Sequence, residues 1–344
     1  MKIALTADPV LPVPPNLYGG IERVIDMLVK GLMERGHEVT LFAHKDSEVL
    51  CELVKYKGLD PQNAGDTWSN MRQVASVRGK EYDVIHSFGR LAYMTMLMPT
   101  ALPKIMSYQR EPSIGMVKMA MRLSKRRTVH FTGCSEYITN QIKPFAPAYA
   151  IPNGVPTDEY TFREQVAADA PLVFLGRIEH IKGTHLAIEV AQKSGRKLII
   201  AGNVPEDKRS RKYFNQMINP HLGGGVEYIG PVNDVQKNEL LGGACALLMP
   251  ILWNEPFGIV MAEALACGTP VIGMSRGAVP EVITDGVNGF ECTSVAEMVD
   301  AVDRIDTLNR KKARAIAEDK FSDTAVVEAY ERLYTLVSMT HKVY

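Results

Sequence analysis

The sequence predicts an α/β protein with two doubly wound halves, each a parallel sheet covered by helices on both faces. Short apolar runs of strand character alternate with amphipathic helical segments along nearly the whole chain. Most of these runs end in turns that contain Gly, Pro or Asn. With 344 residues and 46% apolar content, the chain is long enough for two domains of ordinary size.

The first half begins with a predicted strand at residues 2–8 and a loop rich in Pro and Gly at 9–20. An amphipathic helix is expected at 21–35, and Gly36 ends it. Apolar and β-branched residues predict the further strands of this half at 39–43, 83–87, 104–108, 130–134 and 149–151.

The character of the chain changes after Asn153-Gly154. Residues 156–169 are polar, acidic and without a clear period, which indicates a linker. We therefore place one domain at 1–158 and a second at 159–320. Strands of the second domain are predicted at 172–176, 197–201, 226–229, 245–249 and 270–273, and a helix at 323–339 follows them. In sheets of this kind ligands bind at the carboxyl ends of the strands, so we expect a cleft between two facing halves.

Composition excludes some classes of function. Lys+Arg and Asp+Glu number 39 each, so nothing indicates bulk capture of nucleic acid. The five cysteines are scattered and show no metal-ligand spacing, which predicts reduced thiols and no metal site. No signal peptide and no apolar run of membrane-spanning length is present, so we expect a cytoplasmic protein.

Two glycine-containing loops have the features of anion sites. Gly19 and Gly20 directly precede the first helix, where backbone amides and the helix dipole favour an anion. A flexible loop with a convenient turn is the alternative. Arg177 and Lys182 follow the strand at 172–176 and precede a Gly-Thr helix start. The two side chains could neutralise a diphosphate. The alternative is that they are solvated surface charges, which is more common for isolated cations of this kind.

The most informative stretch is 254–290, NEPFGIVMAEALACGTPVIGMSRGAVPEVITDGVNGF. Glu255 stands before a helix start and Glu263 two turns into the helix, on the order of 12 Å apart at the helical rise. Each carboxylate can accept sugar or ribose hydroxyls. The amides of Phe257, Gly258 and Ile259 would face an anion or a hydroxyl. The alternative is that Glu255 caps the helix and Glu263 lies on its polar face, but the helix is apolar on nearly every side, and a buried carboxylate needs a partner.

Several motifs follow one another along the chain: YGGIERV, NGV at 153–155, GRIEHIKG, and the E-x7-E segment with CGTPVI and GAVPEVI. With these motifs the chain resembles the family 4 retaining glycosyltransferases of GT-B fold over nearly its whole length. The resemblance implies that the second half binds a nucleotide sugar. It also implies that the terminal segment, 321–344, packs back on the first domain.

The same resemblance implies roles for individual residues. Arg177 and Lys182 would contact the diphosphate, Glu263 the ribose and Glu255 the donor sugar. Gly19 and Gly20 would close over the phosphates, and Glu281 would lie near the nucleotide.

One departure from the family concerns the end of the strand at 104–108, where a His is common. Here Gln109 or its neighbour Arg110 stands at that point, and neither shuttles protons at neutral pH. His86 is a candidate substitute for the missing His. The alternative, which we favour, is that His86 is a strand-end histidine with a structural hydrogen bond.

No D-x-D motif is present, which fits metal-independent transfer with no cofactor besides the co-substrate. The resulting prediction is retaining transfer of a hexose from a nucleotide diphosphate sugar, by family frequency a UDP-sugar such as UDP-glucose, to a hydroxyl acceptor. A nucleotide-sugar epimerase, a phosphorylase and a non-catalytic nucleotide-sugar-binding protein are the alternatives. The acceptor, whether small molecule, glycan or lipid, is not indicated by any pattern.

Residues 113–127, SIGMVKMAMRLSKRR, combine apolar residues at helical spacing with five basic ones. Such a helix could lie on an anionic membrane surface. The more common arrangement packs the methionines inward and displays the charges.

Overall fold

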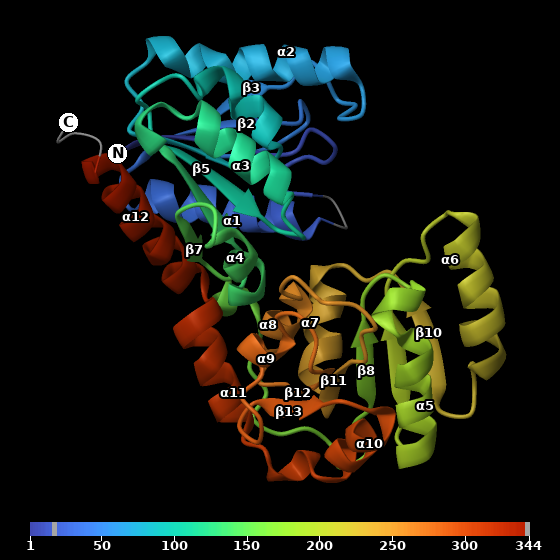
Figure 1. Ribbon diagram of the computed structural model, residues 1–344. Helices are drawn as coiled ribbons and strands as arrows, with labels where there is room; N and C mark the ends of the chain where they lie inside the picture. Colours follow the sequence, from blue (N-terminus) through green and yellow to red (C-terminus); the bar gives the residue numbers. More distant parts are fainter. Residues whose placement is uncertain (16–18, 341–344) are drawn as a thin grey trace. The chain divides into compact units, whose positions relative to one another are not determined.

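The computed structural model describes residues 1–15 and 19–340, and the chain divides into two compact units (Figure 1). Unit 1 consists of Met1–Gly154 and Asp323–Tyr344, and unit 2 of Val155–Ser322. The polar stretch 156–169 belongs to unit 2.

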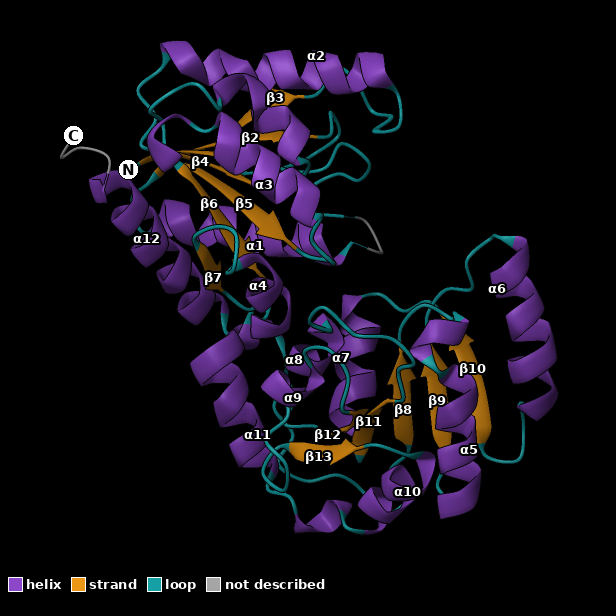
Figure 2. Ribbon diagram, viewed as in Figure 1, coloured by secondary structure: helices purple, strands orange, loops and turns teal. Residues whose placement is uncertain are grey.

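Unit 1 contains a parallel sheet of seven strands within the described residues, in the order β3-β2-β1-β4-β5-β6-β7 (Figure 2). The edge strand β3 was not predicted, because its four residues are exposed or half-buried and carry no apolar run. The strands are β1 (Lys2–Thr6), β2 (Glu38–Ala43), β3 (Glu52–Lys55), β4 (Val84–Ser87), β5 (Lys104–Tyr108), β6 (Val129–Gly133) and β7 (Ala148–Ala150).

The helices of unit 1 cover both faces of this sheet. Helices α1 and α12 pack against each other so closely that a Cβ on Gly31 would lie 2.5 Å from Val327. Figure 1 shows α2 and α3 on the other side of the sheet. The bounds are α1 (Gly20–Glu34), α2 (Ala64–Val74), α3 (Ile114–Leu123), α4 (Glu136–Ile142) and α12 (Asp323–Thr340).

Unit 2 contains a second parallel sheet, of six strands in the part of the chain that is described, in the order β10-β9-β8-β11-β12-β13. Its edge strand β13 was not predicted as a strand, since a glycine opens it and its four residues are few for a pattern. The strands are β8 (Leu172–Leu175), β9 (Leu198–Ala201), β10 (Val226–Gly230), β11 (Ala246–Met249), β12 (Val271–Met274) and β13 (Gly289–Cys292).

In unit 2, helix α5 packs against α10, and α8 packs against α7 and α11. The order of strands and helices confirms the predicted doubly wound α/β class for both sheets. The helices are α5 (Thr184–Ser194), α6 (Lys208–Tyr213), α7 (Asp234–Gly243), α8 (Ile259–Ala266), α9 (Val279–Val282), α10 (Val295–Asp303) and α11 (Arg310–Ile316).

The first and the last residues of unit 2 lie side by side. The amide of Val155 donates to the carbonyl of Phe321 over 2.8 Å, and Val155 and Ser322 form a parallel bridge. Asp323, which follows Ser322, begins α12, and this helix belongs to unit 1. Unit 1 is therefore built from two separate stretches of sequence.

Two sequence predictions concern thiols and membrane spans. All five cysteines are free, and four of them are buried, as expected for reduced core residues. Across residues 1–15 and 19–340, no helix is both long enough and apolar enough to span a bilayer.

Candidate active site

Arg177, Lys182 and Glu255 lie on two loops that follow neighbouring strands of unit 2. Strands β8 and β11 pair in the sheet, so their carboxyl ends meet at one edge. The loop after β8 contacts the loop after β11 directly, through a 2.8 Å hydrogen bond from the amide of Leu252 to the carbonyl of Ile181. Gly183, at φ 74°, leaves no room for a side chain, because a Cβ would lie 1.9 Å from the carbonyl oxygen of Pro250.

This contact brings Lys182 to Glu255. The Nζ of Lys182 lies 2.6 Å from Oε2 of Glu255, and both side chains are largely buried. The same oxygen accepts a hydrogen bond from Nε1 of Trp253 over 3.0 Å, and the lysine ammonium lies 4.8 Å from the centre of the Trp253 ring. Within the described residues Oε1 of Glu255 accepts no hydrogen bond. One oxygen of this carboxylate is thus anchored, and the other can accept hydroxyl donors.

The backbone of Glu255 is held by the turn at Gly277. The two residues form a parallel bridge, and the amide of Ala278 donates to the Glu255 carbonyl over 2.8 Å. Gly277 has a φ of 59°, and a Cβ there would lie 2.3 Å from the Glu255 carbonyl oxygen. Helix α9 follows this turn and carries the exposed Glu281 in its first turn. The predicted turn at Gly277 therefore fixes the backbone position of Glu255.

Helix α8 begins at Ile259, with Gly258 as its N-cap residue in the left-handed region at φ 80°. No side chain of the described residues caps the helix, so the alternative in which Glu255 is the cap is wrong. Residues 258–260 are half-exposed, whereas Phe257 is buried against Phe321 at 5.7 Å between ring centres. The free amides at the start of α8 are therefore the part of this helix that a ligand can reach.

Glu263 is buried in α8, as the apolar helix predicted, and it has the same kind of anchor as Glu255. Its Oε1 lies 2.5 Å from Nζ of Lys237 and accepts the hydroxyl of Tyr160 over 2.9 Å. The Lys237 ammonium lies 5.6 Å from the centre of the Tyr160 ring. Burial and the neighbouring Glu263 charge raise the pKa of Tyr160 well above its usual range, so the phenol remains a donor. Among the described contacts Oε2 has no partner.

Each carboxylate is thus clamped through a single oxygen by a lysine and an aromatic donor that contact each other. Trp253, Tyr160 and Lys237 were not predicted from sequence. Of these three residues, only Trp253 could have been found from the sequence, because it lies two residues before Glu255. Tyr160 and Lys237 lie 103 and 26 residues from Glu263, so no local spacing could have revealed them.

Arg177 lies on the loop after β8, as predicted. Its Nη1 lies 3.2 Å from Oε1 of Glu179, and about a third of its side chain is exposed. The structure thus places Arg177 and Lys182 on the loop that contacts Glu255. Glu263 is the fifth residue of α8, so it lies little more than one turn into the helix and not two turns as predicted.

In unit 1, Gly19 is the N-cap residue of α1 and Gly20 is its first residue. Gly19 has a φ of 153°, and a Cβ there would lie 2.7 Å from Pro15 and 2.8 Å from Oε2 of Glu22. The glycine is therefore required by the turn itself. Tyr18, which precedes it in the YGGIERV motif, lies outside the described residues.

Gln109 directly follows β5 at its carboxyl end. Both polar atoms of its amide are buried, and neither has a hydrogen-bond partner in the described part of the chain. Arg110, in contrast, is exposed. A buried amide without partners is uncommon and is expected where a ligand or water completes the site. Of the two residues predicted for this point, Gln109 therefore has the stronger case.

His86 lies in β4 and is completely buried. Its Nδ1 is 2.7 Å from the hydroxyl of Tyr334, and its Nε2 is 2.6 Å from Oγ of Ser107. Burial lowers the pKa of His86 to about 3, so the ring is neutral. Both nitrogens are occupied, which favours the interpretation of His86 as a structural histidine over that of a proton shuttle.

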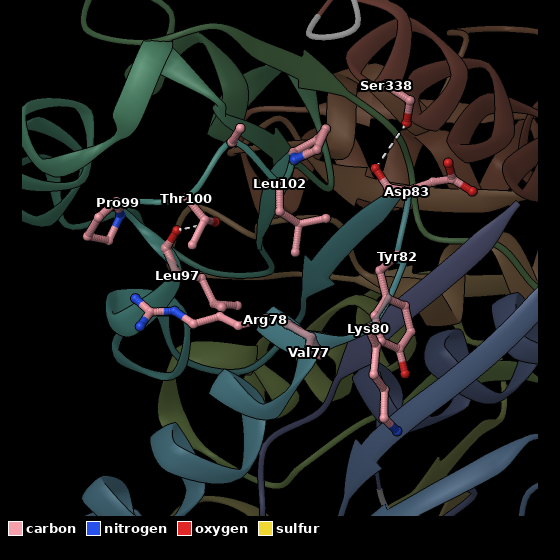
Figure 3. A pocket seen from close by; sticks show the side chains of 12 residues that line it. Val77, Arg78, Lys80, Tyr82, Asp83, Leu97, Pro99, Thr100, Leu102 and Ser338 are labelled. Carbon is pink, nitrogen blue, oxygen red and sulfur yellow. Dashed lines mark hydrogen bonds between the residues drawn. The ribbon is translucent and has the colours of Figure 1, made fainter.

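A separate cavity of about 660 Å³ lies in unit 1 (Figure 3). It adjoins the amino ends of β4 and β5, next to Asp83 and Pro103, whereas Gln109 follows the carboxyl end of β5. Arg78, Lys80 and Ser338 also line it. None of the residues predicted for the active site belongs to its described lining, so this cavity is not part of the candidate site.

The chain matches two protein-family models that together cover most of its length. Residues 18–159 match the model of Glycosyltransferase Family 4, and residues 159–322 match that of Glycosyl transferases group 1. N-acetyl-alpha-D-glucosaminyl L-malate synthase of Bacillus anthracis is 32% identical over 146 residues, which are 40% of this chain and 37% of that protein. This chain thus matches little more than a third of the length of that relative.

Solved structures match over almost the whole chain. AviGT4, a glycosyltransferase involved in avilamycin A biosynthesis, is 25% identical with a TM-score of 0.73, over 98% of both chains. HepE of Anabaena, solved with UDP and glucose, is 18% identical with a TM-score of 0.76, over 97% of this chain and 99% of that one. The latter likeness shows the fold alone. The two family models together with the GT-B fold identify the chain as a member of the group 1 glycosyltransferases of family 4 type.

Proposed function

We propose that the protein transfers a hexose from a UDP-sugar to a hydroxyl acceptor, with retention of configuration and without an obligatory metal. The observation that carries the proposal is the pair of clamped carboxylates, Glu255 and Glu263. Each is anchored through Oε2 or Oε1 by a lysine and an aromatic donor, and each keeps its second oxygen for a ligand. One carboxylate just before α8 and one within it can accept hydrogen bonds from a ligand with hydroxyl groups at both ends.

In this proposal the free oxygen of Glu255 accepts hydrogen bonds from the donor hexose, and that of Glu263 accepts them from the ribose. The diphosphate between them is neutralised by Arg177 and Lys182 and by the free amides at the start of α8. An ammonium group has three N–H donors, so Lys182 can contact a phosphate oxygen while it still holds Glu255. Glu281 is proposed to lie near the nucleotide, and Gly19 and Gly20 are proposed to contact the phosphates, as the family resemblance implies.

Retention follows from a reaction on one face of the sugar. The bond from the anomeric carbon to the diphosphate oxygen breaks, the acceptor oxygen bonds to that carbon, and the acceptor proton passes to the departing diphosphate. The charge that develops on the diphosphate is stabilised by Arg177 and Lys182, in the manner of an oxyanion site. Gln109 is proposed to hydrogen-bond a hydroxyl of the reacting sugar, which would satisfy its buried amide.

The choice of UDP and glucose rests on a relative of the same fold. HepE of Anabaena has been solved with UDP-glucose, at 19% identity and a TM-score of 0.75. ADP is bound in another protein of this fold, the catalytic domain of starch synthase IV from Arabidopsis thaliana. The base and the sugar are therefore the parts of the proposal to test first.

The test has two steps. A thermal-shift panel of nucleotide diphosphates and their sugars should show the largest rise in Tm with UDP and UDP-glucose, since a bound ligand stabilises by mass action. Release of UDP should then depend on an acceptor from a panel of sugars, hydroxy acids and lipids, and nuclear magnetic resonance should show the donor's anomeric configuration in the product. The Glu255→Ala variant should be nearly inactive, whereas Glu227→Ala, at an exposed position of β10, should retain activity.

Other results would replace the proposal. Conversion of the donor without acceptor would indicate an epimerase, and a requirement for orthophosphate would indicate a phosphorylase. Tight binding without turnover across the acceptor panel would indicate a binding protein. A larger stabilisation by GDP or ADP than by UDP would change the donor and leave the reaction type in place.

A further inference from the structure

Helix α3 in unit 1 exposes two large apolar residues while the two residues that it buries are small. Of its ten residues, Val117 and Ala120 are buried, and both have short side chains. Met119 is 41% and Leu123 50% exposed. A helix on a water-facing surface normally turns its largest apolar residues inward. The prediction that this helix buries its methionines is wrong for Met119.

The exposed apolar residues lie among basic ones. Lys118 and Arg122 are exposed on α3, and Lys125, Arg126 and Arg127 are exposed in the 3-10 turn that follows it. No acidic residue occurs between positions 113 and 127, although the whole chain has a formal net charge of zero. The segment is therefore a local concentration of positive charge on an otherwise balanced protein.

The turn after α3 is strained. Arg126 and Arg127 have φ angles of 52° and 54°, in the left-handed region that residues with a side chain seldom adopt. Neither side chain is buried, so core packing does not explain the conformation. Strain of this kind concentrates where a segment serves a function. In this case it keeps two guanidinium groups at the surface, next to the end of α3.

The same surface continues onto the neighbouring helix α4. Phe145, just beyond the end of α4, is 41% exposed, and the ammonium of Lys118 lies 4.3 Å from the centre of its ring. This cation–π contact places an aromatic ring beside the basic and apolar residues of α3. Aromatic rings, long aliphatic side chains and lysine or arginine are the residues found at membrane interfaces.

We propose that the exposed side chains of residues 118–127 and of Phe145, which we term the α3 surface, dock on an anionic lipid bilayer. Met119, Leu123 and Phe145 enter the boundary between headgroups and acyl chains, while the basic residues contact lipid phosphates. Charge complementarity selects this partner, because the α3 surface contains five basic residues and no acidic one. A nucleic acid would use the charges but would leave Met119 and Leu123 in water. The proposal concerns unit 1 alone and does not depend on the donor or on the reaction.

The test is flotation of the full-length protein with vesicles at about 0.15 M salt, near physiological ionic strength. We expect binding to vesicles of phosphatidylcholine with about 30% phosphatidylglycerol, and no binding to phosphatidylcholine alone. The double variant Arg122→Gln/Lys125→Gln should bind about 30-fold more weakly, from the usual effect of two basic residues at an anionic surface. Met119→Ser/Leu123→Ser should lose about tenfold or more, because less apolar area enters the lipid.

A matched control is available in unit 2. Lys208 and Arg209 are also exposed neighbours on a basic helix, α6. Lys208→Gln/Arg209→Gln removes the same charge and should bind vesicles as the unaltered protein does. Val235→Ser, at a position 74% exposed, controls for the loss of an apolar side chain. All variants replace exposed residues, and an unchanged Tm would show that each is folded.

Three results would overturn the proposal. One is absence of binding to the anionic vesicles. Another is an equal loss in the α6 control, which would mean that net charge alone drives binding. The third is a dimer in solution without lipid that Leu123→Ser dissociates, because the α3 surface would then be an interface with a second copy of the chain. Loss of vesicle binding in both α3 variants, with both controls unaffected, would support it.

Discussion

Lys182 and Glu255 form a buried ion pair, with Nζ 2.6 Å from Oε2, and they come from loops that follow two different strands. The pair therefore joins the loop proposed to hold the diphosphate to the carboxylate proposed to hold the sugar. Removal of either partner leaves the other charge buried without its counter-ion, which is costly for folding. Stability and activity should consequently respond in different ways to substitutions here.

For the first prediction, Lys182→Met should lower the free energy of unfolding by about 3 kcal/mol, because Glu255 remains as an unpaired buried carboxylate. The double variant Lys182→Met/Glu255→Gln should recover most of that loss while turnover stays abolished. Urea unfolding and UDP release measure the two quantities. Equal stability of the single and the double variant would show that the pair is not coupled.

The second prediction concerns the clamp on Glu263. Tyr160→Phe removes one hydrogen bond to Oε1 and keeps the ring beneath Lys237. We expect KM for the nucleotide sugar to rise about tenfold, corresponding to one hydrogen bond to a charged group, while kcat changes little. Steady-state kinetics with varied donor concentration provide the check. A loss confined to kcat would contradict the assignment of Glu263 to the nucleotide.

The third prediction uses two glycines with similar backbone angles. Gly277→Ala should be strongly destabilising and nearly inactive, because its Cβ would lie 2.3 Å from the Glu255 carbonyl oxygen. Gly286 has a φ of 71° and no neighbouring atom within 4 Å of such a Cβ. Gly286→Ala should therefore cost only the left-handed strain, about 1 kcal/mol, and keep activity. Thermal unfolding and turnover of both variants test this, and equal behaviour would remove the support that Gly277 gives to Glu255.

The fourth prediction follows from His86, whose pKa burial lowers to about 3. An unfolded His has a pKa of about 6.5, so below that pH the unfolded chain binds a proton that the folded chain excludes. Stability should fall as the pH drops from about 6.5 towards 3, and it is independent of this group above that range. His86→Gln should be less stable at pH 7.5 and should lose less on acidification.

Urea midpoints at pH 7.5 and pH 5 would check the acid effect. His221→Gln, at an exposed position in unit 2, is the control and should keep the acid sensitivity of the unaltered protein. If His86→Gln retained full stability at pH 7.5 and lost only kcat, the structural interpretation of His86 would be wrong.

The alternation of strands and helices was predictable because the central strands are short, largely apolar runs between turns. The predicted bounds of β5 at 104–108 agree with the structure, and the other predicted strands shift by a residue or two at their ends. Strands β3 and β13 at the sheet edges were missed, since an edge strand needs no apolar run on both faces. The other two edge strands, β7 and β10, were predicted. The fold class therefore follows from the central strands, and only two of these four edge strands could be predicted.

The candidate site was predictable only where its residues are close in sequence. Glu255, Glu263 and the glycines between and after them form one continuous pattern. The clamp of Tyr160 and Lys237 on Glu263 forms when distant segments fold together, so no spacing rule detects it. His86 was ambiguous for the same reason, because Tyr334, which occupies its Nδ1, lies 248 residues away.

Because unit 1 is built from two stretches of sequence on either side of unit 2, its parts are synthesised at different times. Its sheet is complete by residue 154, yet the helix that covers His86 follows the whole of unit 2 in the sequence. On the ribosome, the whole of unit 2 emerges before that helix and can fold while unit 1 still exposes an uncovered apolar face. We expect nascent chains to need protection from aggregation during that interval, and a chain that stops before α12 to retain a folded unit 2 beside an incomplete unit 1.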